Sequence, residues 1–211
     1  MMKNFFTATC LALLGLTLLT SSTSAAEPTD LLGSELTKSW ETTGNWELKD
    51  GVAVLTPRAG EKGWTRWAMY LWSKQEYKDF EIEFDYKVEK GGNSGFYFNV
   101  GDKNDPVKKG IEVQIYDSAS QPDSKPLNDH DSGGIIPGVP PTKRVAKAAG
   151  EWNHMVVTVQ GGKVIVKLNG TTINELALDN PKIKDRPDHG YIGFQDHGLP
   201  LAVKNIKLRK L

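Results

Sequence analysis

A histidine between two aspartates is the first feature of the sequence that suggests chemistry. His130 lies within residues 128–134, which read Asn-Asp-His-Asp-Ser-Gly-Gly. Neighbouring carboxylates raise the pKa of an imidazole toward or above its free value of about 6.5, so His130 can serve as a general base. Oxygen ligands from Asp131 together with the imidazole can also bind a divalent cation. The same residue types dominate turns for conformational reasons, so a polar turn is the alternative.

A second histidine follows a predicted strand near the C-terminus. Residues 193–198 read Gly-Phe-Gln-Asp-His-Gly, so the strand ends in the amide of Gln195, the acid of Asp196 and the imidazole of His197. A strand end is rigid on one side and open on the other, which suits a group that binds or reacts with a ligand. Taken alone, the segment fits a binding site and an ordinary polar loop equally well.

Residues 111–116 read Ile-Glu-Val-Gln-Ile-Tyr, which is the alternation of a strand with two different faces. Glu112, Gln114 and Tyr116 share one face, because successive side chains of a strand point to opposite sides. Sugars present hydroxyl groups and an apolar ring face, so a sugar groove combines carboxylate, amide and aromatic groups. The strand therefore fits a carbohydrate groove, and a solvated strand face is the alternative.

Another strand, residues 80–88, carries three acids at alternate positions. Retaining glucanases with a sandwich fold place paired acids in this way, so Glu81, Glu83 and Asp85 are candidates for such a pair. Here the acids alternate with Phe and Ile throughout the run, which is typical of a strand with one solvent-exposed face. The pattern favours a solvated face over a catalytic pair.

Aromatic side chains cluster in one short segment that holds Trp64, Trp67, Tyr70 and Trp72. Aromatic faces stack well on pyranose rings. Tryptophans in a small β-protein more often pack in the core or at its rim, so packing is the favoured interpretation of this cluster.

The elements that must position these residues are short strands separated by Gly, Pro, Asn and Asp. Residues 160–162 and 169–170 provide turns suited to positive φ, and the first of them makes residues 155–168 a hairpin. Residues 117–149 lack strand pattern and indicate a long functional or disordered loop. Eight or more strands without crossover helices predict an all-β, antiparallel two-sheet sandwich. The predicted strands are residues 80–88, 95–100, 111–116, 152–160, 163–168, 191–195 and 201–208.

Composition and charge exclude several classes of function. Lys plus Arg and Asp plus Glu each total 26, which predicts neither nucleic-acid binding nor binding to an anionic membrane. The single cysteine, Cys10, lies in the N-terminal apolar segment, so the remaining chain has no disulfide, thiolate zinc site or cysteine nucleophile. The chain also lacks a Gly-rich dinucleotide fingerprint. Nothing in the sequence indicates an oligomeric state.

The N-terminus has the pattern of a secretory signal peptide. Lys3 precedes an apolar run from residue 5 to residue 19, and residues 20–26 are small or polar. The run is shorter than the roughly 20 residues that span a bilayer, which disfavours the alternative of a membrane anchor. We predict a signal peptide at residues 1–26, one sandwich domain at residues 27–211, and a secreted or periplasmic protein without a membrane span.

An ordered set of short blocks resembles the 3-keto-disaccharide hydrolase domain family, formerly a domain of unknown function. The resemblance covers nearly the whole chain after residue 26. Each block is short, but the ordered set is specific. The blocks are residues 93–98, 110–115, 130–133, 150–153, 168–170, 193–198 and 204–206.

The resemblance implies a concanavalin-A-like jelly roll that acts on 3-ketoglycosides in exported bacterial proteins. Lys143 and Arg144 occupy a region where relatives often carry a lysine. Residues 134–141 depart from the family pattern on the expected leaving-group side of the pocket. The residues that the resemblance implies around one groove are Glu112, Gln114, His130, Asp131, Gln195 and His197.

The substrate chemistry predicts a mechanism of elimination and water addition. It requires a base, a group that stabilises an enolate, and an acid for the departing oxygen. We predict His130 or His197 as the base, with the other histidine or a bound divalent cation stabilising the enolate. Glu112 would position a sugar hydroxyl or bind that cation, with His130 and Asp131 as further possible ligands, and Lys143 completes the predicted catalytic set.

Substrate contacts are expected from a second group of side chains near the predicted groove. A noncatalytic carbohydrate-binding module is the main alternative, because the sandwich fold hosts binding proteins as readily as enzymes. An interaction domain of an exported complex is a further alternative and would expose an apolar patch. The predicted substrate-binding residues are Gln114, Tyr116, Asp131, Gln195 and Asp196.

Overall fold

A computed structural model describes residues 1, 2 and 27–211 of the chain. The predicted signal peptide falls almost entirely outside these residues. No helix within the described part has both the length and the apolar character needed to cross a membrane.

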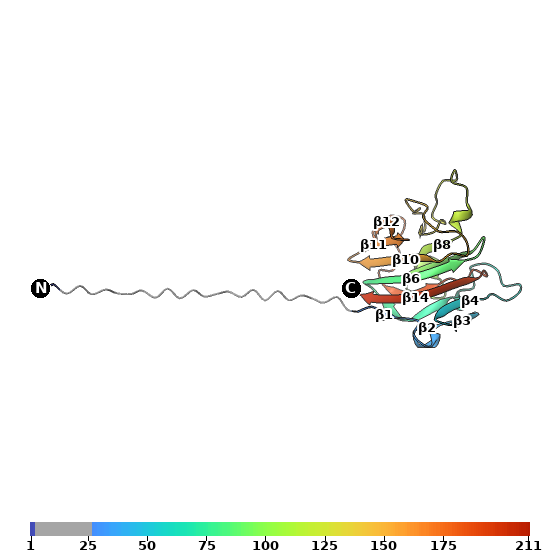
Figure 1. Cartoon of the computed structure of the whole chain (residues 1–211), viewed down its shortest axis with the longest axis horizontal. Helices are drawn as coiled ribbons and strands as arrows, with labels where there is room; N and C mark the ends of the chain where they lie inside the picture. Colours follow the sequence, from blue (N-terminus) through green and yellow to red (C-terminus); the bar gives the residue numbers. More distant parts are fainter. Residues whose placement is uncertain (3–26) are drawn as a thin grey trace.

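The described chain folds into two antiparallel sheets that pack face to face (Figure 1), which confirms the predicted all-β jelly-roll sandwich. One sheet has eight strands in the order β12, β11, β10, β6, β14, β4 and β3, with β1 paired to β14. Their bounds are β12 Thr171–Ala177, β11 Lys163–Leu168, β10 Asn153–Gln160, β6 Phe80–Val88, β14 Leu201–Lys210, β4 Val52–Leu55, β3 Trp46–Lys49 and β1 Thr29–Asp30.

The second sheet has six strands in the order β2, β5, β13, β7, β8 and β9. Helical segments are short and lie in the connections between strands. The strand bounds are β2 Trp40–Glu41, β5 Leu71–Tyr77, β13 Gly190–Phe194, β7 Asn93–Val100, β8 Ile111–Tyr116 and β9 Ile135–Ile136. The helical segments are η1 Leu36–Lys38, η2 Trp67–Met69, α1 Pro106–Lys109 and η3 Ser118–Ser120.

The hydrophobic core fills the space between the sheets because each strand turns its apolar positions inward. In β6 every second residue from Phe80 to Val88 is buried. Aromatic side chains form the centre of the core, where the ring of Phe194 lies 5.0 Å from Phe84 and 5.4 Å from Phe96, measured between centroids. Burial of this kind stabilises by roughly 25 cal/mol per Å² of apolar surface, so the core fixes the face that each strand presents outward.

Most predicted strands match the structure closely. β6, β8 and β11 have the predicted bounds, and β10 and β11 form the predicted hairpin, whose turn places Gly161 at φ 56° and Gly162 at φ 78°. Asn169 and Gly170 form the second predicted turn, with φ 50° and 80°. The strands that the sequence did not predict are β1 to β5, β9 and β12. All of them are two to seven residues long, and the alternation of β5 and β12 is interrupted.

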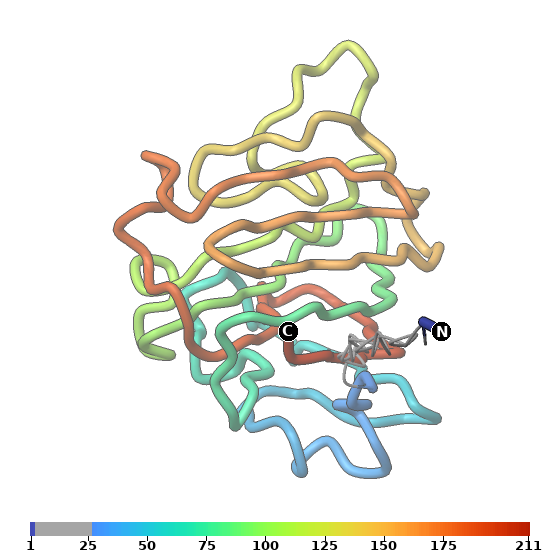
Figure 2. The backbone as a smooth tube through the Cα atoms, turned by 90° about the vertical axis from the view of Figure 1, so that its left-hand side faces the viewer, coloured from blue at the N-terminus to red at the C-terminus, as the bar shows by residue number. Residues whose placement is uncertain are grey.

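The long segment at residues 117–149 is mostly irregular, as predicted, and it projects from one end of the sandwich (Figures 1 and 2). It is nevertheless attached to the six-stranded sheet. The amide of Gln114 donates to the carbonyl of Gly134, and the amide of Gly133 donates to the carbonyl of Gln114, each at 2.8 Å. Because His130 lies just before this attachment, the loop holds His130 beside β8.

Candidate active site

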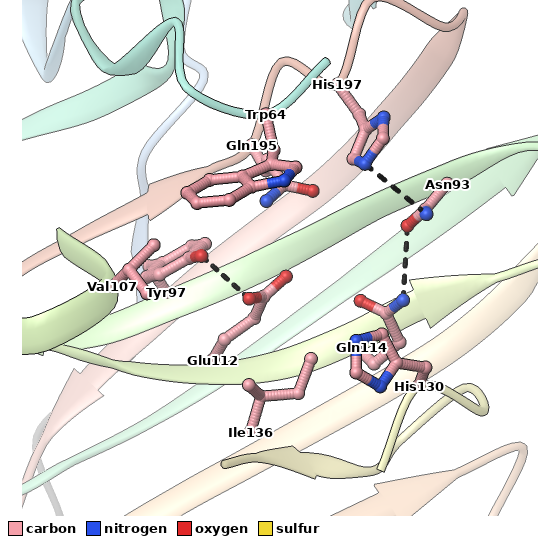
Figure 3. Close-up of a pocket in the computed structure, with 10 residues that line it drawn as sticks. All are labelled: Trp64, Asn93, Tyr97, Val107, Glu112, Gln114, His130, Ile136, Gln195 and His197. Atoms are coloured by element: carbon pink, nitrogen blue, oxygen red, sulfur yellow. Dashed lines mark hydrogen bonds between the residues drawn. The ribbon is translucent and has the colours of Figure 1, made fainter. Parts of the chain in front are cut away.

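A hollow of about 220 Å³ lies on the outer face of the six-stranded sheet. Its floor is built by β7 and β8, whose antiparallel register places Tyr97 opposite Glu112 and Gly95 opposite Gln114. Alternate residues of the same strands face the core, so the polar set is confined to the outer face. Figure 3 shows the lining residues, which are Trp64, Asn93, Tyr97, Val107, Glu112, Gln114, His130, Ile136, Gln195 and His197.

Glu112 provides the buried carboxyl group of the hollow. Only 6% of Glu112 is exposed, and its Oε2 accepts a 2.7 Å hydrogen bond from the hydroxyl of Tyr97. Burial raises the pKa of Glu112 to about 7; the negative charge of Asp129 adds to the rise and the Tyr97 hydroxyl opposes it. Gly95 leaves room for this carboxyl, since a Cβ at that position would collide with Oε1 of Glu112.

A chain of amide groups joins the two sides of the hollow. The side chain of Gln114 lies 3.1 Å from Oδ1 of Asn93, and Nδ2 of Asn93 lies 3.5 Å from Nε2 of His197 (Figure 3). In the rotated orientation of its amide, Gln114 donates to the carbonyl of Ser94 at 2.8 Å and to Oε1 of Glu112 at 3.3 Å. In either orientation the Gln114 amide lies on the floor of the hollow between Glu112 and Asn93.

His197 lies at one rim of the hollow, directly after Asp196. Burial lowers the pKa of His197, although its own backbone and the charge of Asp196 act in the opposite direction. Asp196 is fully buried, and its carboxylate binds Nη2 of Arg66 at 2.9 Å and the amide of Gly198 at 2.8 Å. Arg66 also binds Glu61 at 3.1 Å. The ion pair anchors the loop that carries His197.

His130 lies at the opposite rim, and 67% of its side chain is exposed. Its Nδ1 lies 2.8 Å from Oδ1 of Asp129, whose other oxygen accepts a 2.6 Å hydrogen bond from the amide of Gly138. Burial alone would raise the pKa of Asp129, but the hydrogen bonds from Gly138 and His130 outweigh it and the pKa is lowered. Asp129 therefore stays ionised beside the imidazole and fixes its orientation.

A second hollow of about 200 Å³ adjoins the first and shares Asn93, Gln114 and His130 with it. Asp131 lies in its wall, where its Oδ2 accepts from the amide of Asn128 at 3.0 Å and its Oδ1 lies 3.5 Å from Arg144. The remaining lining residues are Tyr116, Lys125 and Asn128. His130 stands where the two hollows meet.

Aromatic side chains form the wall beside Tyr97. Tyr70 and Trp72 are buried and pack against Tyr97 with centroid distances of 5.7 Å and 6.0 Å, so these two follow the favoured packing interpretation. Trp64 differs, because 43% of it is exposed and it lines the hollow. Gln195 also lines the hollow, and its buried amide oxygen has no hydrogen-bond partner within the described residues.

The structure brings together most of the predicted site residues and leaves some of them elsewhere. Tyr116 and Asp131 line only the second hollow. Asp196 lines neither hollow, because Arg66 holds its carboxylate. Lys143 is exposed and also lines neither, whereas the adjacent Arg144 reaches Asp131. The predicted residues that line the first hollow are Glu112, Gln114, His130, Gln195 and His197.

The three possible cation ligands named from the sequence do not gather into one site. No group of three or more His, Cys, Asp and Glu side chains in the described part of the chain is placed to hold a metal ion. Asp131 is directed toward Arg144 and the Asn128 amide, whereas Glu112 is bonded to Tyr97. The arrangement thus offers hydrogen-bonding and proton-transfer groups.

The three acids of β6 lie on the outer face of the other sheet. Glu81 pairs with Arg209, Glu83 lies 3.8 Å from Lys207, and Asp85 lies 2.8 Å from His154. They line neither hollow described above, so the paired-acid mechanism of glucanases has no support here, as the alternation had indicated.

Sequence reasoning missed Asn93, Tyr97 and Arg66. The alternation of residues 93–98 places Asn93, Gly95 and Tyr97 on one face, but only the pairing of β7 with β8 shows that this face meets Glu112. Arg66 is separated from Asp196 by 130 positions, and no local pattern connects them.

The protein is a β-sandwich with a polar, aromatic-walled hollow, and its family and relatives indicate a carbohydrate-active protein of the glycosyl hydrolase type. Two crystal structures from Parabacteroides distasonis, both assigned as glycosyl hydrolases, are similar to it. The first has a TM-score of 0.74 and 27% identity, and covers 88% of this chain and 100% of its own. The second has a TM-score of 0.66 and 25% identity, and covers 82% and 89%. A Bacillus subtilis protein with a galectin-like fold, 13% identical, shares the fold with a TM-score of 0.59, covering 89% of this chain and 96% of its own.

Residues 27–209 match the profile of the 3-keto-alpha-glucoside-1,2-lyase-like domain. The chain belongs to this family. A 3-keto-disaccharide hydrolase of Bacteroides thetaiotaomicron is 25% identical over 203 residues, which cover 79% of this chain and 70% of the relative. These matches confirm the family that the sequence blocks indicated.

Proposed function

We propose that this protein cleaves glycosides that carry a ketone at C3, by elimination followed by addition of water. The convergence of Glu112, His130 and His197 on one hollow is the observation that carries the proposal. The family is named for a lyase that acts on 3-keto-alpha-glucosides, and the Bacteroides relative is named a hydrolase of 3-keto-disaccharides, so both names describe substrates with a ketone at C3.

A ketone at C3 makes the C2 hydrogen acidic and places the glycosidic oxygen on the carbon β to the carbonyl. His197 is the proposed base, because a lowered pKa keeps its ring neutral near pH 7 and able to accept a proton. Its ring takes the C2 proton, and the electrons of the C–H bond form the enolate. The enolate then re-forms the C3 carbonyl and a C1–C2 double bond while the bond from C1 to the glycosidic oxygen breaks.

His130 is the proposed acid for the departing oxygen, because it stands where the two hollows meet. The carboxylate of Asp129 at its Nδ1 holds the ring in place for this transfer. The leaving group then occupies the second hollow, beside Tyr116 and Lys125. Water adds its hydroxyl group to C1 and C2 regains a proton, so the net reaction is hydrolysis.

Export is part of the proposal and rests on the N-terminal sequence. Residues 1–26 are the proposed signal peptide and residues 27–211 the mature domain. N-terminal sequencing of protein recovered from a secreting host is expected to start near Glu27. Recovery of the intact N-terminus from the cytoplasm would contradict export without affecting the chemistry.

The decisive experiment gives the purified protein a 3-keto-glucoside and its unoxidised parent in parallel. Release of the leaving group is expected from the ketosugar alone. His130→Ala and His197→Ala are each expected to lose at least about 100-fold in kcat/KM, the usual scale of an acid-base group. His189→Ala is the matched control, since its ring lies 2.8 Å from Asp188, as His130 does from Asp129, but lines neither hollow.

Equal rates on both sugars would overturn the proposal. Binding of the ketosugar without turnover would identify a carbohydrate-binding module in its place. If cleavage occurs and neither histidine variant loses activity, the assignment of His130 and His197 is wrong.

A further inference from the structure

Glu112 is a buried carboxyl group that lacks a positive partner. No nitrogen of Lys, Arg or His in the described part of the chain lies within 4.0 Å of its carboxylate, whereas the nearby Asp131 and Asp196 each have an arginine within that distance. An ionised carboxylate in such surroundings is costly, because neither water nor a counterion compensates its charge. The geometry therefore favours the neutral acid.

The groups around Glu112 favour a proton on the oxygen that faces the hollow. Oε2 accepts the short 2.7 Å bond from the Tyr97 hydroxyl, whereas Oε1 has only the longer 3.3 Å approach of the rotated Gln114 amide, so Oε1 is the oxygen that can carry the proton. Tyr97 itself is buried, and burial raises its pKa, which keeps the phenol neutral. The other titratable groups that face this part of the hollow are Asp129, His130, His197 and Tyr70.

We propose that Glu112, as a neutral carboxylic acid backed by Tyr97, donates a hydrogen bond to the C3 oxygen of the ketosugar and stabilises the enolate. This role rests on the proposed function and replaces the sequence-based expectation that Glu112 positions a hydroxyl group or binds a cation. A buried tyrosine and a protonated carboxylic acid serve together in this way in other enolising sites.

The proton and electron transfers that this role requires balance within the elimination. His197 takes the proton from C2, and the C–H electron pair moves to form the C2–C3 double bond while negative charge develops on the C3 oxygen. The proton of Glu112 is shared with that oxygen, and the Tyr97 hydroxyl donates to the carboxyl as it gains negative charge. When the leaving group departs, the C3 carbonyl re-forms and the proton returns fully to Glu112. The acid is therefore unchanged over the cycle.

The role requires space and hydrogen-bond donors around the Glu112 carboxyl, and the structure provides both. Gly95 lacks the Cβ that would displace the carboxyl, so Glu112 can lie flat against β7. In its rotated orientation the Gln114 amide donates to Oε1 of Glu112 at 3.3 Å, which supports the carboxyl as charge develops. Fixed donors aimed at developing charge are the largest single contribution in many enzymes.

The test compares Glu112→Gln with Glu112→Ala across pH. If Glu112 must keep its proton to act as a donor, kcat/KM of the wild-type protein should fall as pH rises above about 7, where Glu112 ionises. The amide that E112Q introduces still donates a hydrogen bond and cannot ionise. E112Q is therefore expected to retain activity within about 10-fold. In the exchange of the C2 hydrogen described below, which needs no acid for a leaving group, E112Q is expected to lose the fall above pH 7. E112A is expected to lose about 10²–10³-fold, the usual loss of one such donor.

A second measurement separates enolate formation from cleavage. The wild-type protein is expected to exchange the C2 hydrogen of a 3-keto-1,5-anhydrosugar, which has no glycosidic leaving group, with deuterium from solvent. E112A and Tyr97→Phe are expected to slow this exchange, and His189→Ala is expected to leave it unchanged, because His189 lines neither hollow.

The outcomes distinguish failure of the inference from failure of the proposed function. If the wild-type protein shows no exchange and no cleavage, the proposed function itself is overturned. Cleavage that is abolished by E112Q, with wild-type activity rising through pH 7, would show that Glu112 acts as an ionised base and would overturn this inference alone. Unchanged exchange in E112A would overturn it as well.

Discussion

Replacement of Glu112 by Gln is expected to stabilise the fold above neutral pH, apart from any effect on activity. Burial raises the pKa of Glu112 from its ordinary value of 4.5 to about 7 in the folded protein. The folded state therefore holds this proton more tightly than the unfolded state does. The contribution of the neutral acid is fully present below about pH 4.5 and is lost as pH rises through about 7.

The size of the effect follows from the displacement of the pKa. At about 1.4 kcal/mol per pH unit, the rise corresponds to ~3 kcal/mol, of which ~2.5 kcal/mol is lost between about pH 5 and pH 8. Gln cannot ionise, so E112Q lacks this loss. The lowered pKa of His197 has the opposite effect on stability, because it destabilises the folded protein at acid pH. Wild type and E112Q share this contribution, so it cancels in the difference between their free energies of unfolding.

Urea denaturation at pH 5 and pH 8 measures the effect. The free energy of unfolding of E112Q relative to wild type is expected to rise by about 2–3 kcal/mol from the lower to the higher pH. Glu47→Gln is the control, because the Glu47 side chain is 64% exposed, and its difference from wild type is expected to stay constant. Equal pH dependence of wild type and E112Q would refute the reasoning that Glu112 is buried without a positive partner.

Three further predictions concern the surroundings of the site. Gly95→Ala places a Cβ against the Glu112 carboxyl, so kcat/KM should fall by at least about 10-fold while circular dichroism stays that of the wild type. Arg66→Met leaves the buried Asp196 carboxylate unpaired, so urea denaturation should show a loss of about 3 kcal/mol that Asp196→Asn partly restores; additive effects would contradict the pairing. Lys125 lines the second hollow, so Lys125→Ala should raise KM for ketosugars whose leaving group is a second sugar and leave KM unchanged when the leaving group is methanol. Equal effects on both substrates would place the leaving group elsewhere.

Local patterns were sufficient to predict the strands and the faces that they present. In β6 and β8 the alternation of apolar and polar residues persists for the whole strand, and burial of one face leaves little freedom in assigning the other. The turn at Gly161 could likewise be recognised, because its backbone requires positive φ. The shorter strands at Trp46–Lys49 and Val52–Leu55 are too brief for alternation to identify them.

The candidate site was only partly predictable, because acids that look alike in sequence have different partners in space. Asp131 and Asp196 each adjoin a histidine, as Asp129 does, yet their carboxylates are directed toward arginines. Lys143 lies in the region where the family resemblance implies a lysine, whereas the adjacent Arg144 is the side chain that reaches Asp131. An ion pair forms wherever the fold brings opposite charges within reach, and sequence spacing does not record that distance.

The sequence by itself determined the all-β class, the family, and the set of polar residues that share the outer face of β8. Only the tertiary structure decided that Tyr97 lies opposite Glu112, that His130 and His197 stand on opposite rims of one hollow, and that the carboxyl between them lacks a counterion within the described chain. The physical reason is that alternation depends on neighbours two positions apart in one strand. Register between strands, burial and charge pairing depend on residues that folding alone brings together.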